Sequence, residues 1–307
     1  MIKTSILALC IFALGHLWAQ TNAWQPSPGH AQMPIWPGAI PDAQVQPPLK
    51  RPEFATNIST AGGRHWVCEC NVTRPTMTVY TPRGTNTGVA VVVFPGGGYM
   101  CLAMDIEGTE ICDWLTSKGI TAVLLKYRVP VNKVGPYGES PLALEDAQRA
   151  LSLVRFHAAE WHIDPHKIGV IGFSAGGHMV AATSTHFDKR SYAPVDAADG
   201  VGCRPDFAIA CYPGHLQRDS GFKLNPNVPV TTNTPPTFIV MAEDDRVDHV
   251  EQALAYYIGL KNAGVSVEMH LYAQGGHAFG LRHPELRLGE WPRLVEKWLA
   301  SIGMTSD

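Results

Sequence analysis

Ser174 lies at the centre of Gly172-Phe173-Ser174-Ala175-Gly176, which has the G-x-S-x-G spacing of a nucleophile elbow. In such an elbow the serine occupies a very sharp turn between a strand and a helix, with strained backbone angles. Side chains two residues before and after it would collide with neighbouring backbone, which accounts for both glycines. Here the motif follows an expected strand and precedes a helical stretch from Ala175 to Thr183. We therefore expect Ser174 to be a nucleophile rather than part of a purely structural glycine turn.

A serine hydroxyl is a poor nucleophile unless a neighbouring base removes its proton. With this elbow the order along the chain is serine, then an acid, then histidine. Among 13 histidines, His277 is the candidate base, because Gly275-Gly276-His277 follows the last expected strand and its glycines let the loop fold over the site. His283, further along the same loop, is the alternative. We expect His270 and His178 to have packing or hydrogen-bonding roles instead.

The third member of a triad must hold the imidazole in the right tautomer and stabilise its cationic form. Four carboxylates are available in the segment 242–248, which follows an expected strand. Asp245 is the candidate acid because it precedes the next helix by the usual spacing, with Asp244, one residue away, as the alternative. Asp248 has a local explanation, since Asp248 and Glu251 have the spacing of a capping box for that helix.

Ester or amide hydrolysis also needs hydrogen-bond donors for the oxyanion of the tetrahedral intermediate. The amide of Ala175, at the start of the helix after the nucleophile, is one candidate donor. Gly97 and Gly98 are the others, in the glycine loop that follows the expected strand Val89–Phe94. Backbone amides approach a substrate closely there because side chains are absent. The alternative is that these glycines only turn the chain.

Strand and helix patterns alternate along the chain, which predicts a mostly parallel, doubly wound α/β sheet covered by helices on both faces. Expected strands are 89–94, 121–125, 168–173, 207–211, 237–241 and 265–272. Expected helices include one stopped by Gly119, one capped by Ser140-Pro141, one at about 248–262 and one from about Glu290. No linker divides this alternation, so we expect a single domain over residues 61–307.

The N-terminus has the layout of a signal peptide at residues 1–20, with Lys3 followed by an apolar run and small residues. A proline-rich segment over residues 21–60 is expected to lie over the domain or to be partly disordered. These features predict export to a secreted or periplasmic location, with no membrane association after signal removal. Six of the seven cysteines follow the signal segment, and their pairing is not determined by the sequence.

A net charge of −3 gives no electrostatic reason to expect nucleic acid or an anionic membrane as a partner. We find no strand–G-x-G-x-x-G–helix unit and no P-loop, so no cofactor is expected. No histidine or cysteine spacing typical of a catalytic metal is present either. A glycosidase would use a carboxylate pair and would have no need of a nucleophile elbow.

Beyond the elbow, the sequence resembles bacterial α/β-hydrolases related to acetyl xylan esterases and feruloyl esterases, often labelled xylanases. The shared stretches run from about Arg64 to the C-terminus: Phe94 to Tyr99, Glu107-Gly108, Tyr127-Arg128, Asp164-Pro165, Gly172 to His178, Ala242 to Asp245, and Gly275 to Gly280. The resemblance implies an α/β-hydrolase fold, a Ser174–Asp245–His277 triad and an oxyanion hole in the glycine loop. One departure is Pro95, where related esterases often have histidine.

The resemblance also implies a serine esterase that acts on a small-molecule or glycan ester, such as acetylated xylan. One alternative is a serine peptidase of the prolyl-oligopeptidase type, although such peptidases usually carry an extra domain. Another is a non-catalytic binding module on a hydrolase scaffold, which would have no need of an intact triad. Acyl-chain length, the sugar and the oligomeric state are not determined by the sequence.

Overall fold

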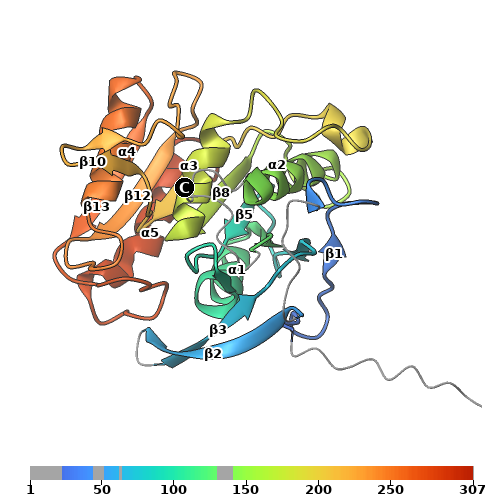
Figure 1. Ribbon diagram of the computed structural model, residues 1–307, viewed down its shortest axis with the longest axis horizontal. Helices are drawn as coiled ribbons and strands as arrows, with labels where there is room; N and C mark the ends of the chain where they lie inside the picture. The colour runs from blue at the N-terminus through green and yellow to red at the C-terminus, as the bar shows by residue number, and fades with distance from the viewer. Residues whose placement is uncertain (1–22, 44–51, 62–63, 130–140, 307) are drawn as a thin grey trace, which may run out of the picture.

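The computed structural model describes residues 23–43, 52–61, 64–129 and 141–306 (Figure 1). An eight-stranded sheet forms its centre, in the order β1-β4-β7-β5-β8-β9-β12-β13. Its strands are β1 (Met33–Pro34), β4 (Thr76–Tyr80), β5 (Ala90–Phe94), β7 (Thr121–Lys126), β8 (Ile168–Phe173), β9 (Ala208–Cys211), β12 (Thr237–Ala242) and β13 (Val267–Tyr272). Neighbouring strands from β7 to β13 pair in parallel. At one edge of the sheet, β4 pairs antiparallel with β7, and β1 pairs antiparallel with β4.

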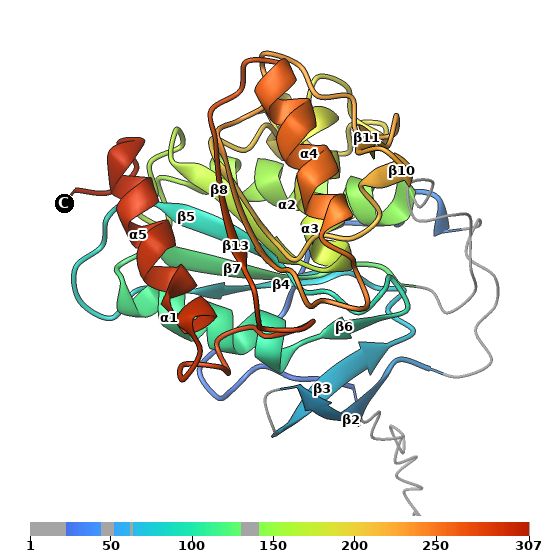
Figure 2. The same cartoon turned by 90° about the vertical axis from the view of Figure 1, so that its left-hand side faces the viewer.

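Helices cover both faces of this sheet, as the alternation in the sequence predicts. They are α1 (Glu110–Ser117), α2 (Pro141–Phe156), α3 (Ala175–Thr185), α4 (Glu251–Asn262) and α5 (Trp291–Ser301). Figure 2 shows α1 and α5 on one face and α2, α3 and α4 on the other. Every residue of β5, β7, β8, β9 and β12 is buried, because helices cover both faces of the sheet at these central strands. The α/β-hydrolase fold expected from the sequence is confirmed.

The order of the strands determines where a site can form. From β5 the chain crosses to β7 on one side, and it then returns to form β8 on the other side of β5. The loops that leave β5 and β8 therefore diverge above the carboxyl ends of two adjacent parallel strands. Such a topological switch point is where open α/β sheets bind ligands. Here these two loops are the glycine loop and the serine elbow.

The N-terminal segment lies on the domain wherever the structure describes it. Trp24 and Trp36 are buried in the core, and β1 extends the main sheet beside β4. The strand β2 (Phe54–Ala61), which spans the predicted boundary between residues 60 and 61, pairs with β3 (Arg64–Cys70). The predicted signal segment and the Ser140 cap lie outside the described residues. Within the described residues, no helix combines the length and the apolar composition needed to cross a membrane.

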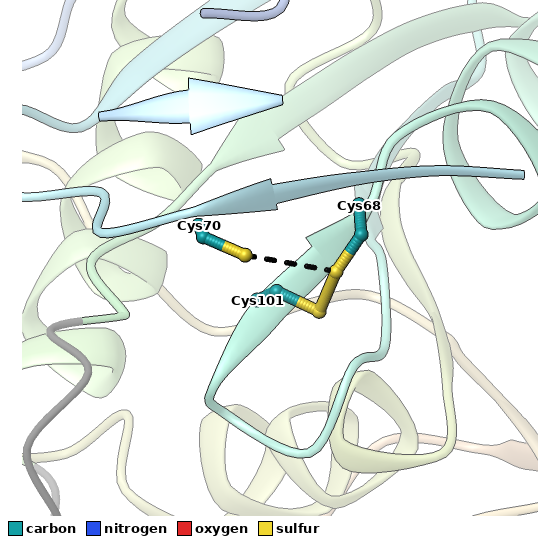
Figure 3. A group of neighbouring side chains, drawn as sticks. All are labelled: Cys68, Cys70 and Cys101. Atoms are coloured by element: carbon teal, nitrogen blue, oxygen red, sulfur yellow. Dashed lines mark hydrogen bonds between the residues drawn. A yellow bond between two sulfur atoms is a disulfide. The ribbon is translucent and has the colours of Figure 1, made fainter. Parts of the chain in front are cut away.

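A group of three sulfur atoms joins the β2–β3 hairpin to the short strand β6 (Cys101–Ala103), which pairs with β3. Figure 3 shows the disulfide between Cys68 and Cys101, with the free thiol of Cys70 beside it. The Cys70 and Cys68 sulfurs are 3.9 Å apart. Because β6 follows the glycine loop directly, this disulfide attaches the end of that loop to the hairpin. Cys112, Cys203 and Cys211 are free and buried.

Candidate active site

The turn at Ser174 has the strained geometry that the elbow motif predicts. Its backbone angles are φ 53° and ψ −117°, outside the regions that non-glycine residues usually adopt. A Cβ at Gly172 would lie 2.1 Å from the Gly176 carbonyl oxygen, and one at Gly176 would lie 2.0 Å from that of Phe94. Both glycines are therefore required for β8, α3 and β5 to approach one another and hold Ser174 at the sheet edge.

The structure brings Ser174, His277 and Asp245 into one hydrogen-bonded line. His277 Nε2 lies 3.0 Å from Ser174 Oγ, and His277 Nδ1 lies 2.7 Å from Asp245 Oδ2. Because a carboxylate only accepts hydrogen bonds, Nδ1 carries the proton and Nε2 of the neutral ring is left as an acceptor for the serine hydroxyl. This is the geometry of a nucleophile, a base and the acid that orients the base.

Asp245, rather than Asp244, faces His277, because the loop after β12 fixes its direction. Asp245 Oδ1 accepts hydrogen bonds from the amides of Val247, at 2.8 Å, and Asp248, at 3.1 Å. Asp244 instead accepts a hydrogen bond from the Gly276 amide at 2.7 Å and ties the two loops together.

The competing histidines lie elsewhere. His283 Nδ1 is 3.0 Å from Glu285, and His270, within β13, pairs with Glu268 and stacks on Phe238. His178 lies on α3, where its Nδ1 is 2.8 Å from the Tyr99 hydroxyl. Burial lowers the pKa of His178 to about 3, so it stays neutral. Through Tyr99 it supports the glycine loop, in agreement with the hydrogen-bonding role expected from the sequence.

The predicted capping box of Asp248 and Glu251 does not form. Helix α4 begins only at Glu251 and has no side-chain cap. The preceding residues instead form a turn around the Asp245 carboxylate, which takes Asp248 away from the helix. Its carboxylate faces the nucleophile, and Ser174 Oγ donates to Asp248 Oδ2 at 3.1 Å. The local sequence rule failed because the tertiary contact determines this side chain.

The glycine loop that contains two of the expected oxyanion donors lies against the elbow that contains the third. A Cβ added to Gly96 would lie 3.0 Å from the Ser174 Cβ, so the glycine loop touches the elbow. Gly97 and Gly98 have φ of 123° and 67°, which favour glycine, and a Cβ at Gly97 would lie 2.3 Å from a carbonyl oxygen. Within the described part of the chain, the amides of Gly97, Gly98 and Ala175 have no protein acceptor.

Glu107 is a residue of the site to which sequence reasoning gave no role. Its Oε2 accepts a hydrogen bond from the Gly96 amide at 2.7 Å, and its Oε1 accepts one from the Tyr212 hydroxyl at 2.9 Å. Tyr212 in turn packs against the His277 ring at 5.2 Å. Glu107 thereby connects the glycine loop with the histidine loop. Burial raises its pKa. The only signal in the sequence was Glu107-Gly108 within the family resemblance.

The charges around His277 favour its cationic form. Burial lowers its pKa, but the hydrogen bond and charge of Asp245, with the charges of Asp248 and Glu107, outweigh burial and raise it above 6.5. Within the described residues, no lysine or arginine pairs with these three carboxyl groups. The site is therefore an uncompensated negative environment that makes His277 a stronger base.

The only described cluster with the composition of a metal site is the sulfur group of Cys68, Cys70 and Cys101. Two of its three sulfurs are joined in the disulfide and offer no thiolate to an ion. None of the triad residues belongs to it. The chemistry that the described arrangement can perform is therefore attack by Ser174 on an acyl carbon, with His277 as base and backbone amides as oxyanion donors.

Comparisons with protein families agree with this geometry. The family model described as BD-FAE matches residues 77–199. The model described as the Prolyl oligopeptidase family matches residues 145–303, more than half of the chain, and includes all three triad positions.

Two of the relatives in the comparison with individual proteins are named for xylan. The chain is 28% identical to an acetylxylan esterase of Xylanibacter ruminicola, over 82% of this chain and 49% of that protein. It is 30% identical to endo-1,4-beta-xylanase B of Butyrivibrio fibrisolvens, over 65% of this chain and 34% of that protein. The chain thus spans half or less of the length of these curated relatives.

Among solved structures, the chain is similar to an acetyl ester-xyloside bifunctional hydrolase of Caldicellulosiruptor lactoaceticus. The TM-score is 0.71 and the identity 32%, over 90% of this chain and 97% of that one. A second similar structure is MGS-M1, an α/β hydrolase from a deep-sea metagenome library, with 26% identity and a TM-score of 0.59.

Proposed function

The chain belongs to the α/β-hydrolases, within the prolyl oligopeptidase family, and we propose that it is a serine carboxylic ester hydrolase. The observation that carries this proposal is the line Ser174–His277–Asp245, with distances of 3.0 and 2.7 Å beside three free amides. The names of the relatives support an esterase, since they include an acetylxylan esterase and an acetyl ester-xyloside hydrolase.

In the first half of the reaction, Ser174 Oγ attacks the ester carbonyl while His277 Nε2 takes its proton. The carbonyl oxygen becomes an oxyanion, which accepts hydrogen bonds from the amides of Gly97, Gly98 and Ala175. His277, stabilised as a cation by Asp245, then gives its proton to the leaving alcohol. The products of this half are the free alcohol and an acyl group bound to Ser174.

In the second half, a water molecule takes the place of the alcohol. His277 accepts a proton from the water as it attacks the acyl carbon, and the oxyanion forms again against the same amides. Collapse of this intermediate returns the proton to Ser174 and releases the carboxylic acid. The raised pKa of His277 suits both halves, because a stronger base removes the proton of a weakly acidic hydroxyl more readily.

For the substrate, we propose a small acyl group, above all acetyl, on a hydroxyl of a plant carbohydrate. The xylan-related names of two relatives support this class, and the net charge of −3 gives no electrostatic reason to expect a polyanionic substrate. We also propose export of the protein. The signal-like N-terminus and the Cys68–Cys101 disulfide support that location, because disulfides persist in oxidising compartments.

The first test is hydrolysis of p-nitrophenyl acetate and p-nitrophenyl octanoate by the wild type and by Ser174→Ala. We expect a strong preference for acetate that disappears in the variant, together with covalent labelling of Ser174 by a fluorophosphonate. Release of acetate from acetylated xylan would extend the result to the natural class of substrate. Full activity of Ser174→Ala would exclude the mechanism, and a preference for octanoate would exclude deacetylation while leaving the triad intact.

Peptidase activity is a second candidate, favoured by the family match over residues 145–303. Peptidases and esterases of this fold share the triad, since both proceed through an acyl-enzyme. The discriminating substrate is an aminoacyl anilide, measured beside p-nitrophenyl acetate with the same enzyme. Cleavage of the anilide without ester hydrolysis would assign the chain to the peptidases.

A further inference from the structure

Ser174 has one proton and two acceptors within hydrogen-bonding distance. Its Oγ lies 3.0 Å from His277 Nε2 and 3.1 Å from Asp248 Oδ2. A hydroxyl donates a single hydrogen bond, so at any moment the serine points its proton either at the base or at the carboxylate. Only the first arrangement leads to proton transfer during attack. A second acceptor beside the nucleophile therefore lowers the fraction of enzyme in the reactive arrangement. Its presence suggests that this carboxylate has a further role.

The surroundings of Asp248 indicate that this position is held by the fold. The side chain is buried, with the residue 8% exposed. A Cβ at Gly214 would lie 2.3 Å from its Oδ1, so the loop after β9 leaves room for the carboxylate only because residue 214 is glycine. The Gly214 amide also donates to the Ser174 carbonyl oxygen at 3.3 Å, which fixes this loop against the elbow.

The Asp248 carboxylate lies close to the imidazole nitrogen that protonates the leaving alcohol. His277 Nε2, which returns the proton to the leaving oxygen, is 3.9 Å from Asp248 Oδ2. The oxyanion donors of the glycine loop receive the carbonyl oxygen instead. Among the described residues, no donor forms a hydrogen bond with Asp248 Oδ1, so the carboxylate can accept a further hydrogen bond besides the one from Ser174.

We propose that Asp248 is a specificity-determining residue that accepts a hydrogen bond from a hydroxyl of the alcohol part of the substrate. This inference rests on the proposed ester hydrolysis and specifies its substrate as the ester of a neutral polyol, such as a sugar with a free hydroxyl next to the acylated one. A carboxylate only accepts, so it matches a hydroxyl donor and repels an anionic group.

The same contact couples recognition to activation. A substrate hydroxyl that donates to Asp248 offsets part of its negative charge and weakens it as an acceptor for the Ser174 hydroxyl, so the serine proton turns to His277. An ester whose alcohol part has no second hydroxyl leaves Ser174 divided between its two acceptors. Hydroxylated esters should therefore have both a higher kcat and a lower KM than esters without a second hydroxyl. A purely structural role of Asp248 would not produce this difference.

The test compares two small acetate esters, ethyl acetate, whose alcohol part has no further hydroxyl, and glyceryl monoacetate, whose alcohol part has two, and adds an acetylated methyl xyloside. The variant is Asp248→Asn, which keeps the shape and removes the charge. Glu243→Gln is the matched control, because Glu243 lies in the same loop, loses the same charge and is exposed. Fluorophosphonate labelling of Ser174 and the thermal midpoint report whether each variant is folded with an intact triad.

We expect the wild type to prefer both hydroxylated esters over ethyl acetate. Charge-assisted hydrogen bonds are roughly twice as strong as neutral ones, so Asp248→Asn should lose about tenfold in kcat/KM on the hydroxylated esters. Its loss on ethyl acetate should be smaller, because only the effect of the Asp248 charge on Ser174 and His277 is removed there. Equal losses on all three esters would overturn the proposal, since Asp248 would then act only on Ser174 and His277. No loss on any ester would overturn it as well.

Failure of this inference is distinguishable from failure of the proposed function. A wild type that cleaves none of the esters would refute ester hydrolysis itself. A wild type that cleaves glyceryl monoacetate better than ethyl acetate but leaves the acetylated xyloside intact would refute the sugar substrate, while hydroxyl recognition by Asp248 would still be measured on the glycerol ester. A wild type with no preference for hydroxylated esters would refute the role of Asp248 alone.

Discussion

Two of the groups of buried charged residues in the described part of the chain differ in whether a cation pairs with their carboxylates. In the structural ion cluster, Arg128 donates to Asp146 at 2.9 Å and to Glu145 at 2.8 Å, with all three side chains buried. Trp36, from the N-terminal segment, donates its indole hydrogen to Asp146 at 2.9 Å. In this cluster a fully buried cation pairs with the carboxylates. Its hydrogen bonds join the N-terminal segment and α2 to the residues that follow β7.

The triad cluster, made of Ser174, His277, Asp245, Asp248 and Glu107, contains three carboxyl groups and, among the described residues, no paired lysine or arginine. Its only basic group is the imidazole, whose pKa these carboxyl groups raise. Because a cation pairs with the carboxylates of the structural ion cluster, that cluster holds parts of the fold together. In the triad cluster no such cation is paired, so the carboxyl groups act on the pKa of one imidazole ring. The comparison teaches that burial of charge alone does not identify a functional site, but uncompensated burial does.

The largest expected effect separates chemistry from stability within the triad cluster. Ser174→Ala should lower kcat/KM for p-nitrophenyl acetate by about 10⁵-fold, because the nucleophile is lost. The free energy of unfolding in urea should change by less than about 1 kcal/mol, since a single hydroxyl is removed without leaving a cavity. Residual activity within tenfold of the wild type would show that the triad cluster is not the catalytic centre.

The structural ion cluster should give the reverse result. Arg128→Met removes the cation and leaves Asp146 buried without its partner, which should lower the free energy of unfolding by about 3–5 kcal/mol. The control is Arg293→Met, whose ion pair with Glu290 is 63% and 64% exposed; its loss should cost less than about 1 kcal/mol. Urea denaturation measures both. A folded Arg128→Met protein that had lost its esterase activity per molecule would contradict the separation of the two clusters.

The Cys68–Cys101 disulfide lies between these two cases, because it supports both stability and the glycine loop. It closes a sequence separation of 33 residues, and its removal in a Cys68→Ser/Cys101→Ser variant should lower the free energy of unfolding by about 2–4 kcal/mol. Activity should also fall, because the Cys101 amide donates to the Gly97 carbonyl oxygen and holds the loop. Dithiothreitol should destabilise the wild type and leave the variant unchanged; equal sensitivity of both proteins would contradict this assignment.

The smallest effect concerns the pH dependence that the triad cluster imposes. Because the pKa of His277 is raised above 6.5, the acid limb of kcat/KM should have its midpoint above pH 6.5, with activity lost as pH falls through it. The same shift stabilises the fold fully below pH 6.5, and this contribution is lost as pH rises through the raised pKa. Glu107→Gln should move the midpoint about half a unit toward acid pH.

The control for this shift is Glu243→Gln, which removes an exposed carboxylate from the loop of Asp245 and should leave the midpoint unchanged. A midpoint below pH 6.5 in the wild type, or an alkaline shift in Glu107→Gln, would show that the surrounding carboxyl groups do not control His277.

The sequence predicted most of the fold because its signals are local. The apolar run of β8 and the glycines around Ser174 can be explained by steric contacts within the motif itself. The alternation of strands and helices indicated a sheet covered on both faces. The sequence did not predict the β2–β3 hairpin for a related reason. Proline marks the segment up to the hairpin, but the pairing of β2 with β3 depends on a partner strand, which no local pattern specifies.

For the site, the chain alone determined which residue types stand at the carboxyl ends of which strands. Parallel strands end at one edge, so Ser174, the segment of Asp245 and the loop of His277 had to meet there. The tertiary structure alone decided which carboxylate faces which group. Asp245 orients the base and Glu107 bridges two loops. Asp248, which had the spacing of a helix cap, instead faces the nucleophile. Side-chain direction follows from packing and from the nearest hydrogen-bond donors across the fold, and these lie far away in the sequence.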